Sequence, residues 1–446
     1  MSKQTAAADG RWHRRVWRLS WPVILANLSV PMLSAVDAGL MGHLPDPSFL
    51  GAVAVAAVIF NYLYWGFGFL RMGTTGLAAQ AWGARDSNEV RATFGRAMLL
   101  AWGLALIVLA LQEPMRLLAF RLLQASADVE SRASLYYAIR IWGGPATLSN
   151  YVILGLLLGL QRPIAALVVQ VAINGLNVAL SVILVIGFDM QVQGVALGTV
   201  MAEYVGLAIG LALVARVLHA TGGRWIMRQL SDLRRFVALA RMNSDILIRT
   251  LLLVSVSAYF IGRSAEFGDN VLAANALIFL LQSIVAFGLD GFAHAAEALI
   301  GDRLGARDRA GLRRVVRAST HWAVVVALAF SVVFLVAGSA LLDLLTDLPD
   351  VRKEALRYLP WAVALPILSV WSFQLDGIFI GATRTAEMRN AMVFSTAVFA
   401  GLVWLLIPLM GNHGLWLAYS IFMVVRALTL GLYYPRVEHA ANPPAA

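Results

Sequence analysis

The chain contains no cysteine and few charged residues. Among its 446 residues, Asp, Glu, Lys and Arg together account for 13%, whereas about 25% is usual in a soluble domain. The absence of cysteine excludes disulfides, thiolate nucleophiles and Cys-bound metals. The shortage of charge, with 60% hydrophobic residues, indicates a membrane protein with no sizeable soluble domain.

The sequence also lacks the signatures of nucleotide, metal and catalytic sites. No G-x-x-x-x-G-K-[ST] loop is present, so ATP hydrolysis is not the expected energy source. There is no H-E-x-x-H and no other cluster of metal ligands. An intramembrane enzyme would need clustered catalytic groups, and none is recognisable. We therefore expect no catalytic residues, no metal and no cofactor.

The chain is instead rich in long apolar stretches, and about twelve of them can each cross a bilayer core of about 30 Å. This pattern predicts an all-α membrane protein with transmembrane helices at approximately 16–41, 51–76, 93–111, 134–160, 164–186, 192–216, 237–261, 272–299, 315–342, 355–381, 390–410 and 413–434. The basic, then apolar, N-terminus has no small-residue cleavage site after it, so we interpret it as an uncleaved first helix.

The net charge of +10 comes mainly from arginines in alternate loops. This distribution favours a topological role over binding of nucleic acid, and it predicts that both termini are cytoplasmic. The expected organisation has five parts: an N-terminal arm (1–15), an N-lobe (16–216), a basic linker (217–236), a C-lobe (237–434) and a C-terminal tail (435–446). The arginine clusters are also compatible with binding of anionic lipid.

Two separate motifs recur at one fixed distance along the chain. AQAWGARDSNEVR at 79–91 is followed by GDRLGARDRAGLR at 301–313, an offset of 222 (301 − 79). LGLLLGLQRP at 154–163 is followed by DGIFIGATRT at 376–385, again an offset of 222 (376 − 154). Each half holds an even number of spans, so the two lobes are predicted to form a parallel repeat suited to alternating access.

The sequence resembles the multidrug and toxic compound extrusion (MATE) transporters, and most of all their DinF branch. The resemblance is carried by WPVILANLSVPMLSAVDAGLMGHL (21–44), LRMGTTGLAAQAWGARD (70–86), NGLNVALSVILVIGFDMQVQGVALGTVMAEY (174–204), LDGFAHAAEA (289–298) and LDGIFIGATRTAEMRN (375–390). It implies two six-helix lobes, export of organic compounds and coupling to an inward flow of H⁺ or Na⁺.

Asp37 is the strongest candidate for the coupling residue. It follows a long apolar stretch, and a carboxylate is costly there unless it is protonated. The resemblance matches Asp37 to a first-helix Asp implicated in coupling, and Pro22 to a proline at which that helix can bend. The alternative is that Asp37 is an interfacial residue, because Gly42 and His43 soon end the helix.

Neutral polar residues are expected to support Asp37. Asn174, Asn177 and Ser181 have helical spacing, so they share one side of a helix. Many relatives carry a second Asp at the position of Ser181, and its absence favours H⁺ over Na⁺. Tyr136 and Thr199 match other positions that line this lobe in relatives. Glu203 and Arg140 also lie in apolar stretches, and we interpret them as structural.

The second lobe offers another set of titratable residues. Asp290, His294 and Glu297 lie at i, i+4 and i+7, hence on one helical face. Asp376 lies where the resemblance places a cation or drug site in other branches. These four residues form either a second proton or substrate site or a structural network. Two further residues, Asp245 and Arg249, are predicted to form an ion pair within their helix.

Relatives of this kind bind bulky amphipathic cations. A cavity for such cations needs to be lined by aromatic rings and by flexible apolar side chains such as methionine. The candidates for such a cavity are Met32, Asn61, Tyr64, Trp65 and Met201; ordinary packing or lipid contact is the alternative for each.

The predicted function is that of a cation-coupled antiporter, with H⁺ favoured, that exports amphipathic and often cationic organic compounds. It is expected to act as a monomer in the lipid bilayer of the bacterial cytoplasmic (inner) membrane. The alternatives are a Na⁺-coupled version of the same exporter and a flippase for a lipid-linked precursor from the same superfamily.

Overall fold

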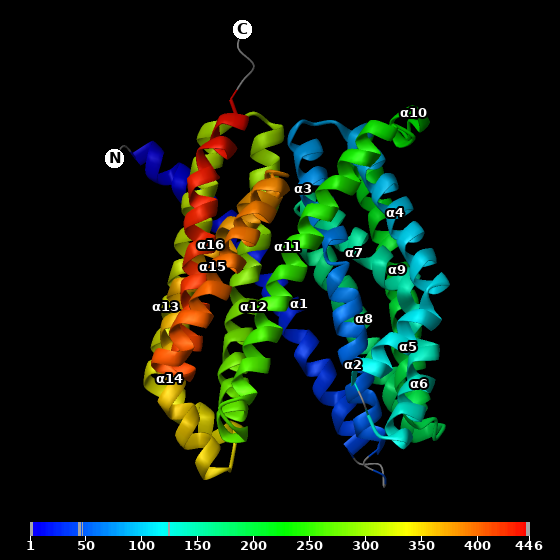
Figure 1. Ribbon diagram of the computed structural model, residues 1–446. Helices are drawn as coiled ribbons and strands as arrows, with labels where there is room; N and C mark the ends of the chain where they lie inside the picture. Colours follow the sequence, from blue (N-terminus) through cyan, green and yellow to red (C-terminus); the bar gives the residue numbers. More distant parts are fainter. Residues whose placement is uncertain (1–2, 43–45, 47, 124, 443–446) are drawn as a thin grey trace. The chain divides into compact units, whose positions relative to one another are not determined.

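The structure is a computed structural model that describes residues 3–42, 46, 48–123 and 125–442 (Figure 1). The side chains at 3–9, 30–32, 34, 35, 38 and 42 lie outside this description. The described residues are helical throughout apart from short turns and loops. Eleven of their helical segments are long and apolar enough to cross a membrane. Together with α1 (Lys3–Gly42), which contains the first predicted span, they match the predicted all-α membrane fold of about twelve spans.

The helices of the first half follow the predicted spans with several interruptions. After α1 come α2 (Ser48–Gly66), α3 (Phe69–Gly83), α4 (Ser87–Ala110), α5 (Gln112–Leu123), α6 (Ala127–Arg140), α7 (Gly144–Gly159), α8 (Pro163–Val182), α9 (Gln191–Thr221) and α10 (Met227–Leu230). A 3₁₀ turn at Ile141–Gly143 joins α6 to α7, and a π-helical turn at Ile183–Gly187 follows α8. The spans predicted at 51–76 and 134–160 are therefore each built from two helices.

The helices of the second half are longer. They are α11 (Leu233–Ala265), α12 (Asp269–Gly305), α13 (Arg309–Leu345), α14 (Pro349–Gly381), α15 (Thr385–Met410) and α16 (Asn412–Ala440). The predicted C-terminal tail begins inside α16, and the predicted N-terminal arm is not a separate segment, because α1 already begins at Lys3.

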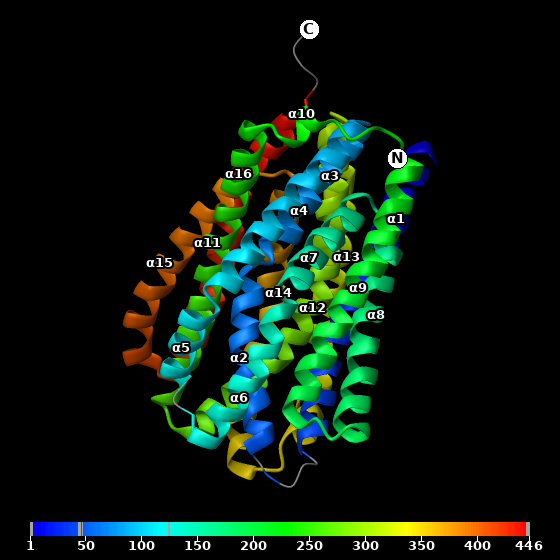
Figure 2. The same cartoon turned by 90° about the vertical axis from the view of Figure 1, so that its right-hand side faces the viewer.

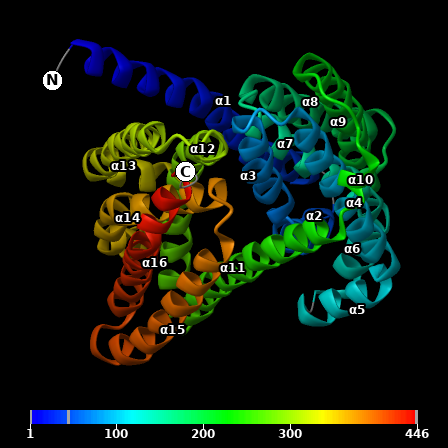
Figure 3. The ribbon, with the colours of Figure 1, turned by 90° about the horizontal axis from the view of Figure 1, so that it is seen from above.

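The chain divides into two compact units, and α1 and α11 each contribute to both. One unit is Leu25–Arg241, and the other joins Met1–Ile24 to Met242–Ala446. Seen from above, α2 to α9 form one bundle and α12 to α16 another (Figure 3). This division assigns the beginning of α1 to the C-terminal helices, whereas the sequence predicts an N-lobe from residue 16. The description below treats each unit by itself.

The same helix crossing occurs once in each unit, at positions 222 residues apart. In the first, α7 crosses α3, and a Cβ on Gly155 would lie 2.5 Å from the carbonyl oxygen of Arg71. In the second, α14 crosses α12, and a Cβ on Gly377 would lie 2.3 Å from the carbonyl oxygen of Ala293. Both offsets are 222 (377 − 155 and 293 − 71). Glycine is needed here because the two backbones touch. In the first unit, α4 packs beside both α3 and α7 (Figure 2).

The turn before the next helix is repeated as well. Arg85 and Arg307 both have positive φ, 57° and 53°, and 307 − 85 is again 222. The following residues, Asp86 and Asp308, cap α4 and α13 by accepting a hydrogen bond from the backbone N–H three residues on. The internal repeat predicted from the sequence is therefore present in the backbone.

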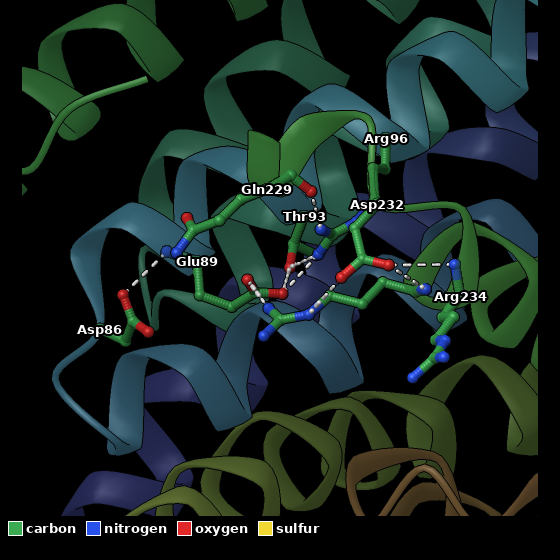
Figure 4. A network of polar contacts seen from close by, with 8 residues as sticks. Asp86, Glu89, Thr93, Arg96, Gln229, Asp232 and Arg234 are labelled. Atoms are coloured by element: carbon green, nitrogen blue, oxygen red, sulfur yellow. Dashed lines mark hydrogen bonds and ion pairs between the residues drawn. The ribbon is translucent and has the colours of Figure 1, made fainter. Parts of the chain in front are cut away.

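The predicted linker folds against the start of α4 (Figure 4). Glu89 accepts from both Arg96 and Arg235, and Arg96 Nη1 also donates to the carbonyl of Gln229 at 2.7 Å. Arg91, also on α4, donates from Nη2 to the carbonyl of Leu218 near the end of α9 at 2.6 Å. These bonds fasten the end of α9 and the segment after it to α4, within the same unit.

Candidate functional site

Asp37 lies in the last turns of α1, and its side chain is partly buried. Its Oδ1 is enclosed by protein, and no donor among the described residues reaches that atom. The charged side chain that acts on the carboxyl is Arg140, at the end of α6. The phenol of Tyr136, one turn earlier on α6, lies within electrostatic range of both groups.

The predicted polar residues of α8 form a chain of hydrogen bonds. Ser181 Oγ donates to Asn177 Oδ1 at 3.2 Å, and Asn177 Nδ2 donates to Thr199 Oγ1 on α9 at 3.1 Å. One turn earlier, Asn174 Nδ2 donates to Ser29 Oγ on α1 at 2.6 Å. The structure thus brings Asn177, Ser181 and Thr199 together, and it ties α8 to the helix that carries Asp37.

Close packing of small residues makes this chain of hydrogen bonds possible. A Cβ on Gly198 of α9 would lie 3.0 Å from the backbone nitrogen of Ser181, so α8 and α9 approach each other closely at this level. Asn177 and Ser181 are almost fully buried. Buried amides and hydroxyls are costly unless they are hydrogen-bonded. This cost explains why Ser181, Asn177 and Thr199 are joined by hydrogen bonds.

Arg140 and Glu203, which the sequence analysis interprets as structural, form a buried ion pair, and the charge of Arg140 acts on Asp37. Arg140 Nη2 donates to Glu203 Oε1 at 2.7 Å, and its Nη1 donates to Oε2 at 3.1 Å. Thr147 donates its hydroxyl proton to the same carboxylate. Arg140 also lies over the rings of Tyr64 and Phe60, at 4.9 and 5.4 Å from their centroids. The signal in the sequence was an Arg and a Glu inside two apolar spans, which rarely occur there without a role.

The predicted cavity residues have different environments. Tyr64 is buried beneath Arg140, whereas Asn61, Trp65 and Met201 are exposed on the surface of their unit. The side chain of Met32 lies outside the described part of the structure. α1 continues without a break through Pro22, so the bend predicted there stays a prediction.

In the second unit, Asp376 of α14 is held by two arginines. Its Oδ2 accepts from Arg426 Nη2 of α16 at 2.8 Å and contacts Arg249 Nη2 of α11. The predicted intrahelical pair of Asp245 and Arg249 is therefore wrong. Asp245 instead accepts from Arg389 Nη1 at 2.5 Å and from Thr385 at 3.1 Å.

The other predicted residues of this unit share α12. Glu297 is fully buried, at the level where α12 meets Gly381 of α14. Asp290 and His294 are partly exposed. Within the described residues, no three His, Asp or Glu side chains are arranged to hold a metal ion.

Three of the positions related to the Asp37 site by the repeat are aromatic. Adding 222 to residues 37, 136 and 177 gives Tyr259, Tyr358 and Phe399. The rings of Tyr259 and Phe399 pack edge to face, with centroids 6.2 Å apart. The first unit therefore carries an acid with polar support, whereas the second has Tyr259 at the position of the acid and packs it against Phe399.

A membrane protein of two repeated helix bundles, with charged groups buried inside each, has the build of a secondary carrier. The MatE family profile matches twice, over residues 22–183 and 246–405. The chain belongs to the MatE family, the multidrug and toxic compound extrusion transporters.

Individual relatives agree with this assignment. The chain is 42% identical over 423 residues to the DNA damage-inducible protein F of Escherichia coli (strain K12), covering 95% of this chain and 92% of that protein. It is 25% identical to the human Multidrug and toxin extrusion protein 1, over 92% of this chain and 72% of that protein. Among solved structures, the Vibrio cholerae MATE transporter VcmN in its bent form superposes with a TM-score of 0.86 at 19% identity, covering 98% of this chain and 99% of that one.

Proposed function

We propose that the protein is a proton-coupled antiporter that exports amphipathic organic compounds by alternating access. It would act in the cytoplasmic membrane of a bacterium, with both termini on the cytoplasmic side. Family membership supports the transport of small organic compounds. The choice of coupling ion rests on one observation, the carboxyl of Asp37 with an enclosed oxygen that no described donor reaches.

The surroundings of Asp37 suggest how a proton could be converted into movement. When its carboxyl is ionised, Asp37 is attracted by the charge of Arg140. Protonation removes that attraction together with the cost of holding a charge in an apolar bundle. α1 would then favour a different packing, and the bond from Asn174 to Ser29 would pass this change to α8. Glu203 keeps Arg140 in place in both states, because it binds the guanidinium at two points.

The hydrogen bonds of the first unit favour H⁺ over Na⁺. A bare Na⁺ needs several oxygen ligands. The amide oxygen of Asn177 already accepts from Ser181, and the hydroxyl oxygen of Thr199 already accepts from Asn177. A proton needs only the carboxyl itself, which supports the assignment of Asp37 as its carrier.

The charges at one end of the second unit support the proposed topology. The first described turns of α1 and the last turn of α16 lie at the same end of this unit (Figure 1). Arg15 pairs with Asp302 there at 3.2 Å, and Arg313 pairs with Glu438 at 2.6 Å. An arginine-rich end is expected on the cytoplasmic side.

The test is transport by the purified protein in proteoliposomes, with ethidium as a fluorescent organic cation. We expect an imposed pH gradient to drive ethidium movement, and an imposed Na⁺ gradient at constant pH to have no effect. Asp37→Asn should abolish the pH-driven transport. Asp46→Asn is the matched control, because Asp46 is a partly exposed loop residue that pairs with Arg132, and it should transport normally. Transport driven by Na⁺ alone, or full activity of Asp37→Asn, would refute the proposal.

A further inference from the structure

Three helices of the second unit each bring one charged side chain to the same buried point. Arg249 comes from α11, Asp376 from α14 and Arg426 from α16. Their exposed fractions are 9%, 7% and 3%. Both arginines bind the same oxygen of Asp376, its Oδ2. The cluster is thus compact and almost fully enclosed.

The cluster carries a net positive charge. Two guanidinium groups face one carboxylate, and arginine stays protonated in proteins. Of the charged side chains, Asp376 and Arg249 act most strongly on Arg426. One turn before Arg249 lies Asp245, but its carboxylate is engaged by Arg389. A net charge inside a helix bundle is costly unless a charge of opposite sign joins it.

The two arginines also have hydrogen-bonding capacity to spare. Arg249 Nε and Arg426 Nε are buried, and within the described residues neither has an acceptor. Arg426 Nη1 meets the thioether sulfur of Met423 at 3.2 Å, and a thioether is a weak acceptor. Unsatisfied buried donors destabilise a structure. A planar anion such as a carboxylate suits these donors, because guanidinium groups bind it at two points.

The neighbourhood of the cluster is aromatic. Arg426 lies over the ring of Phe422, 5.5 Å from its centroid. The ring of Phe422 is 6.2 Å from that of Tyr419 and 5.8 Å from that of Phe399. All three rings are buried, so an anionic group bound at the cluster would be surrounded by apolar side chains.

We propose that Arg249 and Arg426 form a binding site for the carboxylate of an amphipathic organic anion. In the absence of the anion, Asp376 keeps the two guanidinium groups together. When the anion binds, it takes the free Nε donors and cancels the surplus charge. This inference rests on the proposed export function, to which it adds a second substrate class. Binding can nevertheless be measured without any transport.

The test is equilibrium binding of three matched fluorescent probes to the purified full-length protein in a zwitterionic detergent. The probes are 11-(dansylamino)undecanoic acid, its methyl ester and the corresponding amine. A charge-assisted hydrogen bond contributes about 1.5–3 kcal/mol, so the acid should bind roughly 10- to 150-fold more tightly than the ester. Equal binding of acid and ester, or tighter binding of the amine, would overturn the proposal.

Single variants then assign the preference to the cluster. Arg249→Gln and Arg426→Gln should each reduce the preference for the acid at least severalfold while leaving ester binding intact, which shows that the variant is folded. Arg263→Gln is the matched control, since this arginine lies on the same helix and pairs with Glu266 at 2.5 Å near the surface. The preference should be unchanged in this control. A preference that survives in both cluster variants would contradict the assignment.

Asp376→Asn separates a binding site from a purely structural triad. Removing the internal carboxylate leaves two arginines without their shared partner, so the acid should bind severalfold more tightly than in the wild type. A structural triad would give unchanged or weaker binding of the acid, and that result would overturn the proposal.

Asp37→Asn should lose transport but keep the preference for the acid probe. Failure of the proton-coupling proposal can therefore be told apart from failure of the anion-site proposal.

Discussion

At the scale of single residues, the interior of each unit shows that a buried charge is tolerated only with partners. Glu203 binds Arg140 at two points, and the paired side chains are 11% and 9% exposed. Asp376 is likewise bound by two arginines. Asp37 differs from both, because one of its carboxyl oxygens is enclosed with no described donor. A carboxyl in such a place is less costly to bury when it is protonated than when it is ionised, so its two protonation states can favour different packing of α1.

The Arg140–Glu203 pair leads to a stability prediction. Glu203→Gln should lower the free energy of unfolding by about 3–5 kcal/mol, because it leaves a buried guanidinium without its counter-ion. Thermal unfolding in detergent would measure the loss. The control is Glu113→Gln, which removes an exposed pair with Arg116 and should cost about 0–1 kcal/mol. Equal melting temperatures for the two variants would show that the buried pair stabilises the protein no more than the exposed pair does.

At the scale of helices, the repeated crossing of α7 over α3 and of α14 over α12 defines the two bundles. Gly377→Ala should destabilise the protein by about 1–3 kcal/mol, because the new methyl group would be forced against a backbone carbonyl. Gly401→Ala is the matched control on α15, where a Cβ would meet nothing within 4 Å. There the replacement should be neutral or stabilising by about 0.5–1 kcal/mol. Thermal unfolding of both variants would measure these changes in stability. A Gly377→Ala variant as stable as the wild type would refute the close approach of α14 and α12.

The fastening of the linker to α4 gives a second prediction at this scale. Glu89→Gln removes the carboxylate that Arg96 and Arg235 share, so the segment between α9 and α11 should detach more often. Limited trypsin digestion, followed by mass spectrometry, should then show faster cleavage after Arg224 and Arg228 than in the wild type. Unchanged cleavage rates would mean that the backbone contacts of Arg91 and Arg96 suffice to hold the linker.

The sequence predicted the helices and their repeat because both depend on local patterns. Apolar stretches define spans, and the glycines at 155 and 377 lie in recurring motifs. The breaks at residues 67–68 and 141–143 were missed, since their apolar flanks resemble continuous spans. Charge partners were also harder to predict. Asp245 and Arg249 have the spacing of an intrahelical pair, yet each binds a residue more than 100 positions away, which no local pattern reveals.

At the scale of the whole molecule, duplication has produced two halves with different chemistry. The family profile matches both halves, and the backbone repeats its crossings and caps at an offset of 222. Asp37 and its polar support lie in one unit, while the position equivalent to Asp37 in the other is Tyr259. We therefore propose that the Asp37 unit couples transport to protons and that the unit of Arg249 and Arg426 recognises substrate by charge.

The most direct test of the central claim, that Asp37 carries the coupling proton, is proton release on substrate binding. Purified protein in weakly buffered detergent with a pH-sensitive dye would be mixed with ethidium near neutral pH. The account predicts release of protons by the wild type and by Asp46→Asn, and none by Asp37→Asn that still binds ethidium. Equal release by the wild type and Asp37→Asn would contradict it.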